Sequence, residues 1–230
     1  MFDDLVRWVV DCGGIINYNL GLINNNNNRS VIVVNDVKRG EIILKFPKAL
    51  TIGKSNVNVP SYDSVRGTII KLLFEIIKGD KSIFYKYLVS LPCERDLESL
   101  PSNRLTYNEF MKIKDKDFTL WKLLEQHYKD IIQLRKDIGD IDIPDRYKSL
   151  KFVSYLFNLY KTRAWNNFGF VPLVDLLQHS KNPNVYIDVK TDDKYFVMVA
   201  VKDIKKGDEL MHCYNNFTPI QMFMFYGIPI

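Results

Sequence analysis

The spacing of apolar residues changes twice along this chain of 230 residues. Near both ends, short segments rich in Val, Ile and Phe are typical of β-strands. The middle instead places apolar residues three and four positions apart, which is the spacing along one face of an α-helix. This order predicts an α+β protein, and the length suits one domain that carries a helical insertion.

The helices are bounded by the apolar pattern and by the residues that interrupt it. A short first helix is predicted over residues 2–10, ending at Gly13 and Gly14, because glycine readily adopts the left-handed conformation that closes a helix. Further helices are predicted over residues 65–77, 82–91, 120–138 and 147–163, with Asp145, after Pro144, in the first turn of the last one.

Two β-hairpins are predicted from a repeated turn. Residues 35–40 join predicted strands at 30–34 and 41–46, and residues 203–208 join predicted strands at 195–201 and 209–214. Both turns contain an aspartate, which can bond to its own turn backbone, and a glycine, which accepts positive φ. The echo indicates two similar turns and is too short for a repeat fold.

Composition excludes several classes of protein. Hydrophobic residues make up 47% and charged residues 26%, as in ordinary folded proteins. The net charge of +5 is too small and too scattered for a nucleic-acid groove. Cys12, Cys93 and Cys213 form no CxxC pair, so neither a zinc cluster nor a disulfide framework is expected, and a reducing compartment, cytoplasm or nucleus, fits best. No apolar run approaches the roughly 20 residues that cross a bilayer, so we expect neither secretion nor membrane insertion.

Two segments near the end of the chain contain the candidate functional residues. Asp175, Gln178 and His179 interrupt a mostly apolar run over residues 170–180. Burying such groups without hydrogen bonds costs a few kcal/mol, roughly, so they either bind one another or line a ligand pocket. Tyr214 ends the last predicted strand, where a tyrosine is usually a half-buried packing residue.

The order of these pieces resembles that of the SET-domain methyltransferases, within them the group typified by the RuBisCO large-subunit methyltransferase. The resemblance covers nearly the whole chain, and the order of the pieces carries it more than any one of them. The matching pieces are the first helix, residues 36–47, Tyr87-Leu88 with Leu91-Pro92, Arg163-Ala164, Pro172 with Asp175 and His179-Ser180, and Tyr214 with Tyr226-Gly227.

The resemblance implies a SET-domain β fold with a pseudoknot, in which the Gln178-His179 segment and the Tyr214 segment cross to form the cofactor pocket. Residues 1–60 and 163–230 would then form the two parts of the SET domain, and residues 61–162 the helical insertion. The second part would carry the cofactor and catalytic motifs.

The resemblance also implies an activity, which is N-methylation of a lysine on a protein substrate, such as a histone or another basic protein. The donor would be S-adenosylmethionine, no metal would be needed, and we expect a monomer. Tyr214 would be the catalytic residue. The residues implied to bind the cofactor or shape its pocket are Asn28, Arg29, Ser30, Arg163, Asp175, Gln178, His179 and Tyr226.

The chemistry of methyl transfer fits a tyrosine at position 214. Transfer from a sulfonium is an in-line displacement, so the acceptor amine must arrive neutral, aligned and close to the methyl carbon. The hydroxyl of Tyr214, together with backbone carbonyls, would align the reacting groups, and Tyr226 would stabilise a cation by cation–π contact. Water is expected to take the lysine proton, and His179 is assigned to binding, not to base catalysis.

Other functions remain open from the sequence. The same scaffold could methylate histidine, or serve as a non-catalytic SET-like module that binds a protein. The second alternative is favoured by Gln178, where the family usually has Asn, and by Asn28-Arg29-Ser30 in place of a glycine-containing loop. Asn215, where glycine is common, is a milder change.

Two further classes fit the sequence less well. A basic helical interaction protein ranks last, because the basic residues of this chain are interleaved with acidic ones along the predicted helices. A doubly wound methyltransferase would need a GxGxxG motif that this sequence lacks.

Overall fold

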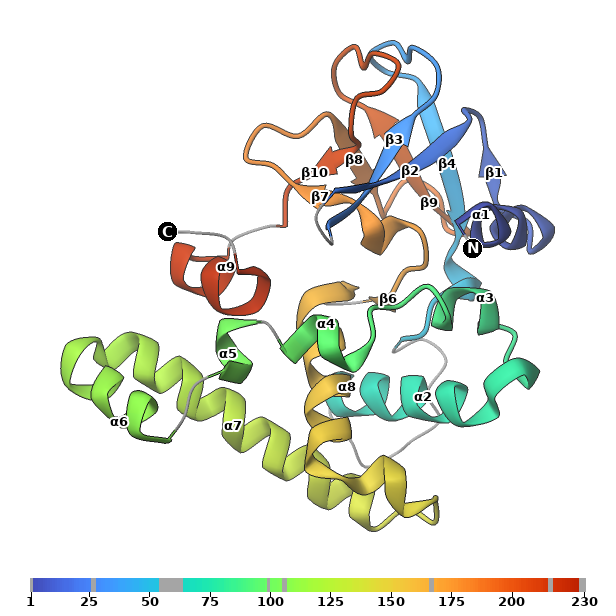
Figure 1. Cartoon of the computed structure of the whole chain (residues 1–230). Coiled ribbons are helices and arrows are strands. Elements are labelled where there is room, and N and C mark those ends of the chain that lie inside the picture. The colour runs from blue at the N-terminus through green and yellow to red at the C-terminus, as the bar shows by residue number, and fades with distance from the viewer. Residues whose placement is uncertain are drawn as a thin grey trace. The chain divides into compact units, whose positions relative to one another are not determined.

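The chain alternates between two structural units. The computed structural model, drawn in Figure 1, describes residues 2–25, 28–53, 64–98, 100–104, 107–165, 168–214 and 217–227. The first unit, here the β unit, comprises Met1–Gly53, Lys78–Leu91 and Trp165–Asn215. The second, the helical unit, comprises Lys54–Ile77, Pro92–Ala164 and Asn216–Ile230.

The β unit begins with α1 (Phe2–Asp11), which buries Leu5 and Val9. The helix ends where the sequence predicted. Gly13 has a φ of 92°, and the N–H of Gly14 donates to the carbonyl of Val9 over 2.8 Å. The glycine pair thus satisfies a carbonyl that the end of the helix would otherwise leave unpaired.

The main sheet of the β unit is antiparallel and has the strand order β1-β4-β9-β8. The central strands β4 (Ile42–Pro47) and β9 (Tyr195–Ala200) are mostly buried, and the Phe46 and Phe196 rings stack with centroids 6.5 Å apart. The outer strands are β1 (Ile15–Ile16) and β8 (Val185–Asp188).

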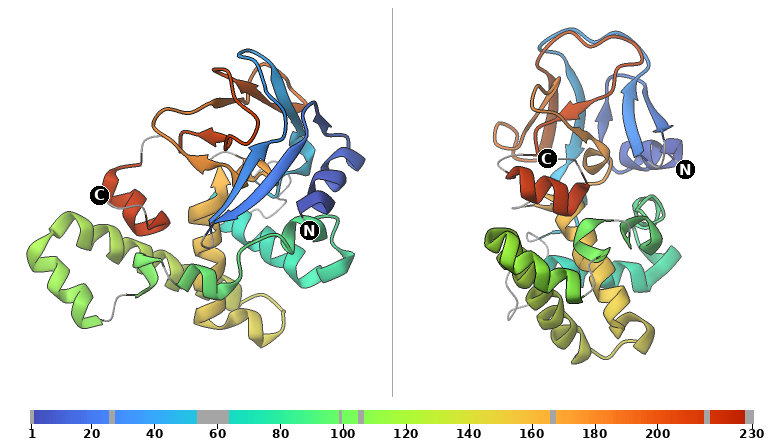
Figure 2. Two further views of the ribbon diagram at one scale, coloured as in Figure 1. Left: turned by 45° about the horizontal axis from the view of Figure 1, so that its top comes forward. Right: turned by 60° about the vertical axis from the view of Figure 1, so that its left-hand side comes forward.

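The first predicted hairpin is wrong, because its two strands have other partners. Strand β3 (Asn28–Val33) pairs with β2 (Leu20–Asn25), and these two strands lie side by side in Figure 2. Strand β4 pairs with β1 and β9 instead. The run of asparagines at residues 24–28 includes the end of β2 and the start of β3, while residues 26–27 lie outside the described residues. Turn chemistry specified the bend at residues 35–40 but not the partners of the strands around it.

The second predicted hairpin is also wrong, and the two turns pair with each other. Val37 and Ile204 each donate a backbone N–H to the other's carbonyl over 2.9 Å. Two ion pairs flank this bridge, one between Lys205 and Asp36 and one between Lys38 and Asp203, each over 2.9 Å. The repeated sequence therefore builds one contact with approximate twofold symmetry.

The crossing of two late segments is confirmed. Strand β7 (Gln178–His179) pairs in parallel with β10 (Met211–His212), with Gln178 opposite Met211 and His179 opposite His212. Parallel neighbours need a long connection, and here it contains β8 and β9. This pairing brings the segments around His179 and Tyr214 together.

The helices predicted for the middle of the chain are confirmed in part, and the helices at Glu94–Glu98, Pro101–Arg104 and Tyr107–Lys116 were not predicted. Predicted helices over residues 65–77 and 120–138 correspond to α2 (Ser64–Lys78) and α7 (Phe118–Gly139). Of residues 82–91, only one turn is α-helical, α3 (Tyr85–Leu88), which belongs to the β unit. Asp145 begins a separate 3-10 turn (Asp145–Lys148), because Ser149 caps α8 (Leu150–Arg163) by accepting the N–H of Phe152 over 3.2 Å.

The helical unit also contains shorter helices, which pack on α7, on α8 or on one another. In helix α9 (Pro219–Tyr226), Met224 and Phe225 pack against Leu124 of α7. Among the described residues, no helix is both long and apolar enough to span a bilayer. The remaining helices of this unit are α4 (Glu94–Glu98), α5 (Pro101–Arg104) and α6 (Tyr107–Lys116).

The short elements in the rest of the described chain are β5 (Ala164–Trp165), β6 (Gly169–Phe170) and 3-10 turns at Lys48–Leu50, Gly79–Lys81 and Val174–Leu176.

Candidate active site

A strained turn leads the chain into the candidate site. Leu173, only 2% exposed, has φ 70° and ψ −43°, the one positive φ among the described residues other than glycine. This conformation is unfavourable for a residue with a β-carbon, and such strain persists only where the surroundings enforce it. Here it reverses the chain before the 3-10 turn Val174–Leu176 and strand β7.

Tyr214 is held against the end of this segment at both its backbone and its side chain. Its N–H donates to Nδ1 of His179 over 3.1 Å. Its hydroxyl donates to the carbonyl of Leu177 over 2.6 Å. Two anchors on one residue fix the position of the phenol oxygen.

His179 is a neutral imidazole in this arrangement. Burial, and next the charge of Lys181, lower the pKa of His179. Since Nδ1 accepts the N–H of Tyr214, the hydrogen of the neutral ring is on Nε2. The imidazole and the Tyr214 ring are tilted, with centroids 5.2 Å apart.

Asp175 and Gln178 are tied to other parts of the β unit. The hydroxyl of Tyr87 donates to a carboxylate oxygen of Asp175 over 2.8 Å, and both residues are buried. The amide nitrogen of Gln178 donates to the carbonyl of Arg29 over 2.7 Å, and Arg29 donates from its guanidinium to the carbonyl of Ser90 over 2.6 Å. These hydrogen bonds go to residues outside the group of Asp175, Gln178 and His179, so they are not the mutual binding that the sequence offered as one alternative. The other alternative, that these residues line a ligand pocket, stays a prediction.

The remaining predicted site residues are distributed over both units. Asn28 begins β3, and Ser30, on the same strand, is buried. Arg163 is the last residue of α8, and Tyr226, the last residue of α9, donates its hydroxyl to the carbonyl of Lys161 over 3.3 Å. Asn215 lies outside the described residues.

Two aromatic residues were missed from the sequence, His212, which contacts Tyr214, and Trp165, which contacts His212. His212 lies with its ring centroid 4.9 Å from that of Tyr214, and Trp165 stacks on His212 at 5.0 Å with an interplanar angle of 19°. Alternation along a strand puts residues i and i+2 on one face, so the spacing of His212 and Tyr214 was a usable signal. No local pattern pointed to Trp165.

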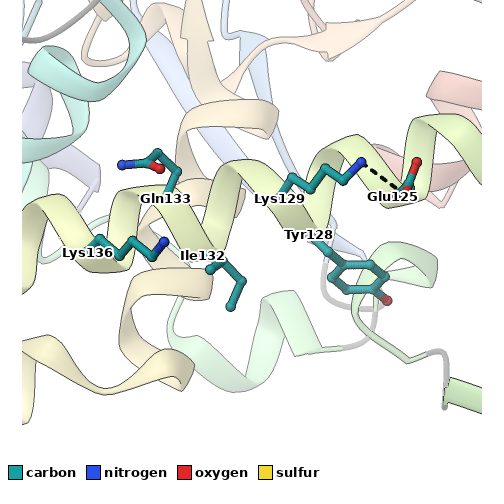
Figure 3. A pocket seen from close by; sticks show the side chains of 6 residues that line it. All are labelled: Glu125, Tyr128, Lys129, Ile132, Gln133 and Lys136. Carbon is teal, nitrogen blue, oxygen red and sulfur yellow. Dashed lines mark ion pairs between the residues drawn. The ribbon is translucent and has the colours of Figure 1, made fainter.

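A shallow groove of about 400 Å³ lies along α7 in the helical unit (Figure 3). None of the predicted site residues lines it. Its lining, which includes the Glu125–Lys129 ion pair, consists of Glu125, Tyr128, Lys129, Ile132, Gln133 and Lys136. The groove is therefore not the candidate active site.

Comparisons with known proteins were made for sequence and for structure. The family model described as SET domain matches residues 28–215. No curated protein sequence matches the chain. Among solved structures, the SET domain of LSMT bound to lysine and AdoHcy superposes with a TM-score of 0.76 at 17% identity, covering 99% of this chain and 57% of that one. Rubisco LSMT bound to AdoMet gives 0.76 at 18% identity, covering 99% and 56%. This chain thus spans a little over half the length of those proteins.

Proposed function

Because this chain belongs to the SET-domain family, we propose that it is a protein methyltransferase that uses S-adenosylmethionine to methylate a lysine side chain. The observation that carries the proposal is the double anchoring of Tyr214 beside β7, by the Tyr214 N–H to His179 and by the Tyr214 hydroxyl to Leu177. Similar solved structures were determined with AdoMet and with sinefungin and monomethyllysine, which supports the same donor and acceptor here.

The residues near Tyr214 suit a sulfonium donor. When bound, S-adenosylmethionine supplies an activated methyl group whose hydrogens are polarised by the adjacent positive sulfur. Oxygen atoms are appropriate neighbours for such a group, and the Leu177 carbonyl and the Tyr214 hydroxyl lie 2.6 Å apart. Within the β unit we assign Asp175, Gln178, His179 and the Asn28–Ser30 segment to the donor, and the cofactor roles of Arg163 and Tyr226 stay predictions.

The hydroxyl of Tyr214 is oriented for accepting hydrogen bonds. Because its own hydrogen is directed to Leu177, the phenol oxygen can act toward the acceptor amine or the polarised methyl only as a hydrogen-bond acceptor. A fixed acceptor of this kind orients a reactant without the cost of reorganising at the moment of reaction. Tyr214 therefore acts by alignment and not as an acid or a base.

Proton loss from the acceptor amine goes to water. A free lysine has a pKa of about 10.4 and must be deprotonated before it attacks. His179 is poorly placed to take that proton, because Nδ1 accepts the N–H of Tyr214 and Nε2 carries the ring hydrogen. This favours the binding role that the sequence indicated for His179.

One observation favours the alternative of a non-catalytic protein-binding module. One hydrogen of the Gln178 amide is donated to the carbonyl of Arg29, so one donor fewer is left for a cofactor. Calorimetric titration with S-adenosylmethionine separates the two functions, since the module has no need to bind the donor. A histidine acceptor on the same scaffold is distinguished by identifying the methylated residue.

The test of the proposed function is radiolabelled methyl transfer from S-adenosylmethionine to proteins of a cell extract, with mass-spectrometric identification of the modified residue.

We expect Tyr214→Phe to lower the rate at least 100-fold, a loss of roughly 3 kcal/mol of transition-state stabilisation, while the cofactor still binds. Tyr186→Phe is the matched control, because Tyr186 is 58% exposed on β8. Undiminished activity of Tyr214→Phe would exclude the mechanism.

A further inference from the structure

His212 occupies the centre of an aromatic stack in the β unit. The ring of Trp165 covers one side of the imidazole almost in parallel, 5.0 Å away with an interplanar angle of 19°. The ring of Tyr214 lies 4.9 Å from the imidazole at 53°. His212 is thus the side chain that joins the large indole to the phenol of the candidate catalytic residue.

A second imidazole contacts the same phenol. His179 lies 5.2 Å from Tyr214, and β7 and β10 pair with His179 opposite His212. The Tyr214 ring is therefore contacted by two imidazoles from two adjacent strands. His179 additionally holds the Tyr214 backbone, whereas His212 contacts the ring itself.

The imidazole of His212 is uncharged at neutral pH. Burial, and next the proximity of His179, lower its pKa to about 4. The titratable groups that face it are His179 of β7 and the Tyr214 phenol, and Lys181 acts on His179 in turn. A neutral ring here packs like an aromatic hydrocarbon of similar shape, with offset and tilted contacts.

We propose that His212 is a positioning residue, whose flat ring, backed by Trp165, sets the orientation of the Tyr214 phenol for methyl transfer. The proposal rests on the function proposed above for Tyr214. Its physical basis is the stack itself, in which the His212 imidazole lies 4.9 Å from the Tyr214 ring and is backed by Trp165 at 5.0 Å. A flat ring at this distance restricts tilting of the phenol about its hydroxyl and backbone hydrogen bonds.

The ring shape, not the nitrogen atoms, is what this role requires. His212→Phe keeps a flat ring between Trp165 and Tyr214, whereas His212→Ala removes it. We expect His212→Ala to lower kcat on the order of 10- to 100-fold, because a small misplacement of an aligning group is costly, with little change in KM for S-adenosylmethionine. His212→Phe should restore most of kcat.

Ile43→Ala is the control for a general loss of packing. Ile43 is completely buried on β4 in the same unit. Its truncation should lower the melting temperature but leave kcat near that of the unmodified protein. If Ile43→Ala and His212→Ala reduce kcat equally, His212 has no specific effect on Tyr214 and the proposal fails.

A measurement independent of activity completes the test. In protein with ¹³C-labelled tyrosine, the ring signal of Tyr214 is assigned by its loss in Tyr214→Phe. We expect this signal to move toward the value of a free tyrosine in His212→Ala but not in His212→Phe or Ile43→Ala. An unchanged signal in His212→Ala would overturn the proposal. A shifted signal in a protein that transfers no methyl group would uphold the positioning role and reject the proposed function instead.

Discussion

The hydroxyl of Tyr87 donates a hydrogen bond to a carboxylate oxygen of Asp175 over 2.8 Å, and both side chains are buried. Tyr87 is in α3, and Asp175 lies in the 3-10 turn immediately before β7. The bond therefore connects the short helix α3 with the segment that supports Tyr214. A buried carboxylate is costly to desolvate, so this donor has a large effect on the stability of the turn.

Tyr87→Phe is expected to lower the free energy of unfolding by about 2 kcal/mol, because it removes a hydrogen bond to a buried carboxylate and leaves that oxygen without its donor. Chemical denaturation with a shared m-value measures the change. Tyr186→Phe, on the exposed side of β8, should change the free energy by no more than a few tenths of a kcal/mol, roughly. Equal effects of the two substitutions would mean that the bond does not stabilise the fold.

The two turns were predicted correctly and the strand partners wrongly, because turns depend on local sequence and strand pairing does not. Residues 35–40 and 203–208 were identified as turns because Asp and Gly determine backbone conformation over a few residues. Which strands then pair depends on burial across the whole unit, and the turns pair with each other through Val37 and Ile204. The helices were predicted more accurately, since their hydrogen bonds and their apolar spacing are both local.

For the candidate site, the ordered motifs predicted which segments meet, but contacts between residues far apart in the sequence were not predicted. The resemblance of ordered motifs predicted that the His179 and Tyr214 segments meet, and the bond between the Tyr214 N–H and His179 confirms it. The contact of Trp165 with His212 was not predicted, because it joins residues 47 positions apart without a periodic pattern. The assignment of residues to cofactor binding stays a prediction.

Gln178→Ala is predicted to weaken binding of S-adenosylmethionine about tenfold, since the amide of Gln178 holds the carbonyl of Arg29 in the segment assigned to the donor. Gln178→Asn should weaken it similarly, because the amide is then one methylene too short to reach Arg29. Isothermal titration calorimetry gives both affinities. Gln126→Ala, on the exposed face of α7, is the control and should bind normally. Tighter binding by Gln178→Ala would contradict the assignment.

His127 is a buried histidine in the helical unit, and it should make that unit sensitive to acid. Within the described part of the chain, neither of its ring nitrogens has a hydrogen-bond partner. Its ring lies 5.2 Å from Phe157 and 5.7 Å from Phe225, and Lys161 extends over both of these rings. Burial, and next the charge of Lys161, lower the pKa of His127 to about 4.

The direction of the pH effect follows from the lowered pKa. Below pH 6.5 the unfolded chain takes up a proton at His127, whereas the folded chain does not until about pH 4, so stability is lost as the pH falls through this interval. The loss at pH 4 is about 3 kcal/mol. We expect His127→Phe to reduce the difference in unfolding free energy between pH 7 and pH 4 by most of this amount. An unchanged difference would mean that His127 is not buried in its neutral form.

The last prediction concerns two glycines where the chain passes close to itself before the site. Ile52 and Phe170 exchange two backbone hydrogen bonds of 3.0 Å, which draws Gly53 and Gly169 together. A β-carbon on Gly53 would meet the carbonyl of Phe168, and one on Gly169 would meet the carbonyl of Ile52. Gly169 also has a φ of 78°, which other residues rarely adopt.

Gly53→Ala and Gly169→Ala are each expected to lower the free energy of unfolding by more than about 3 kcal/mol, because backbone atoms cannot move aside as a side chain can. Gly139→Ala is the matched control, since a β-carbon there meets no atom within 4 Å and the residue ends α7. In a helix, alanine is favoured over glycine by roughly 1 kcal/mol, so this variant should be as stable as the unmodified protein or more so. Thermal and urea unfolding of the three variants measure the difference, and a loss in Gly53→Ala no larger than in Gly139→Ala would show that Gly53 and Phe168 are not in close contact.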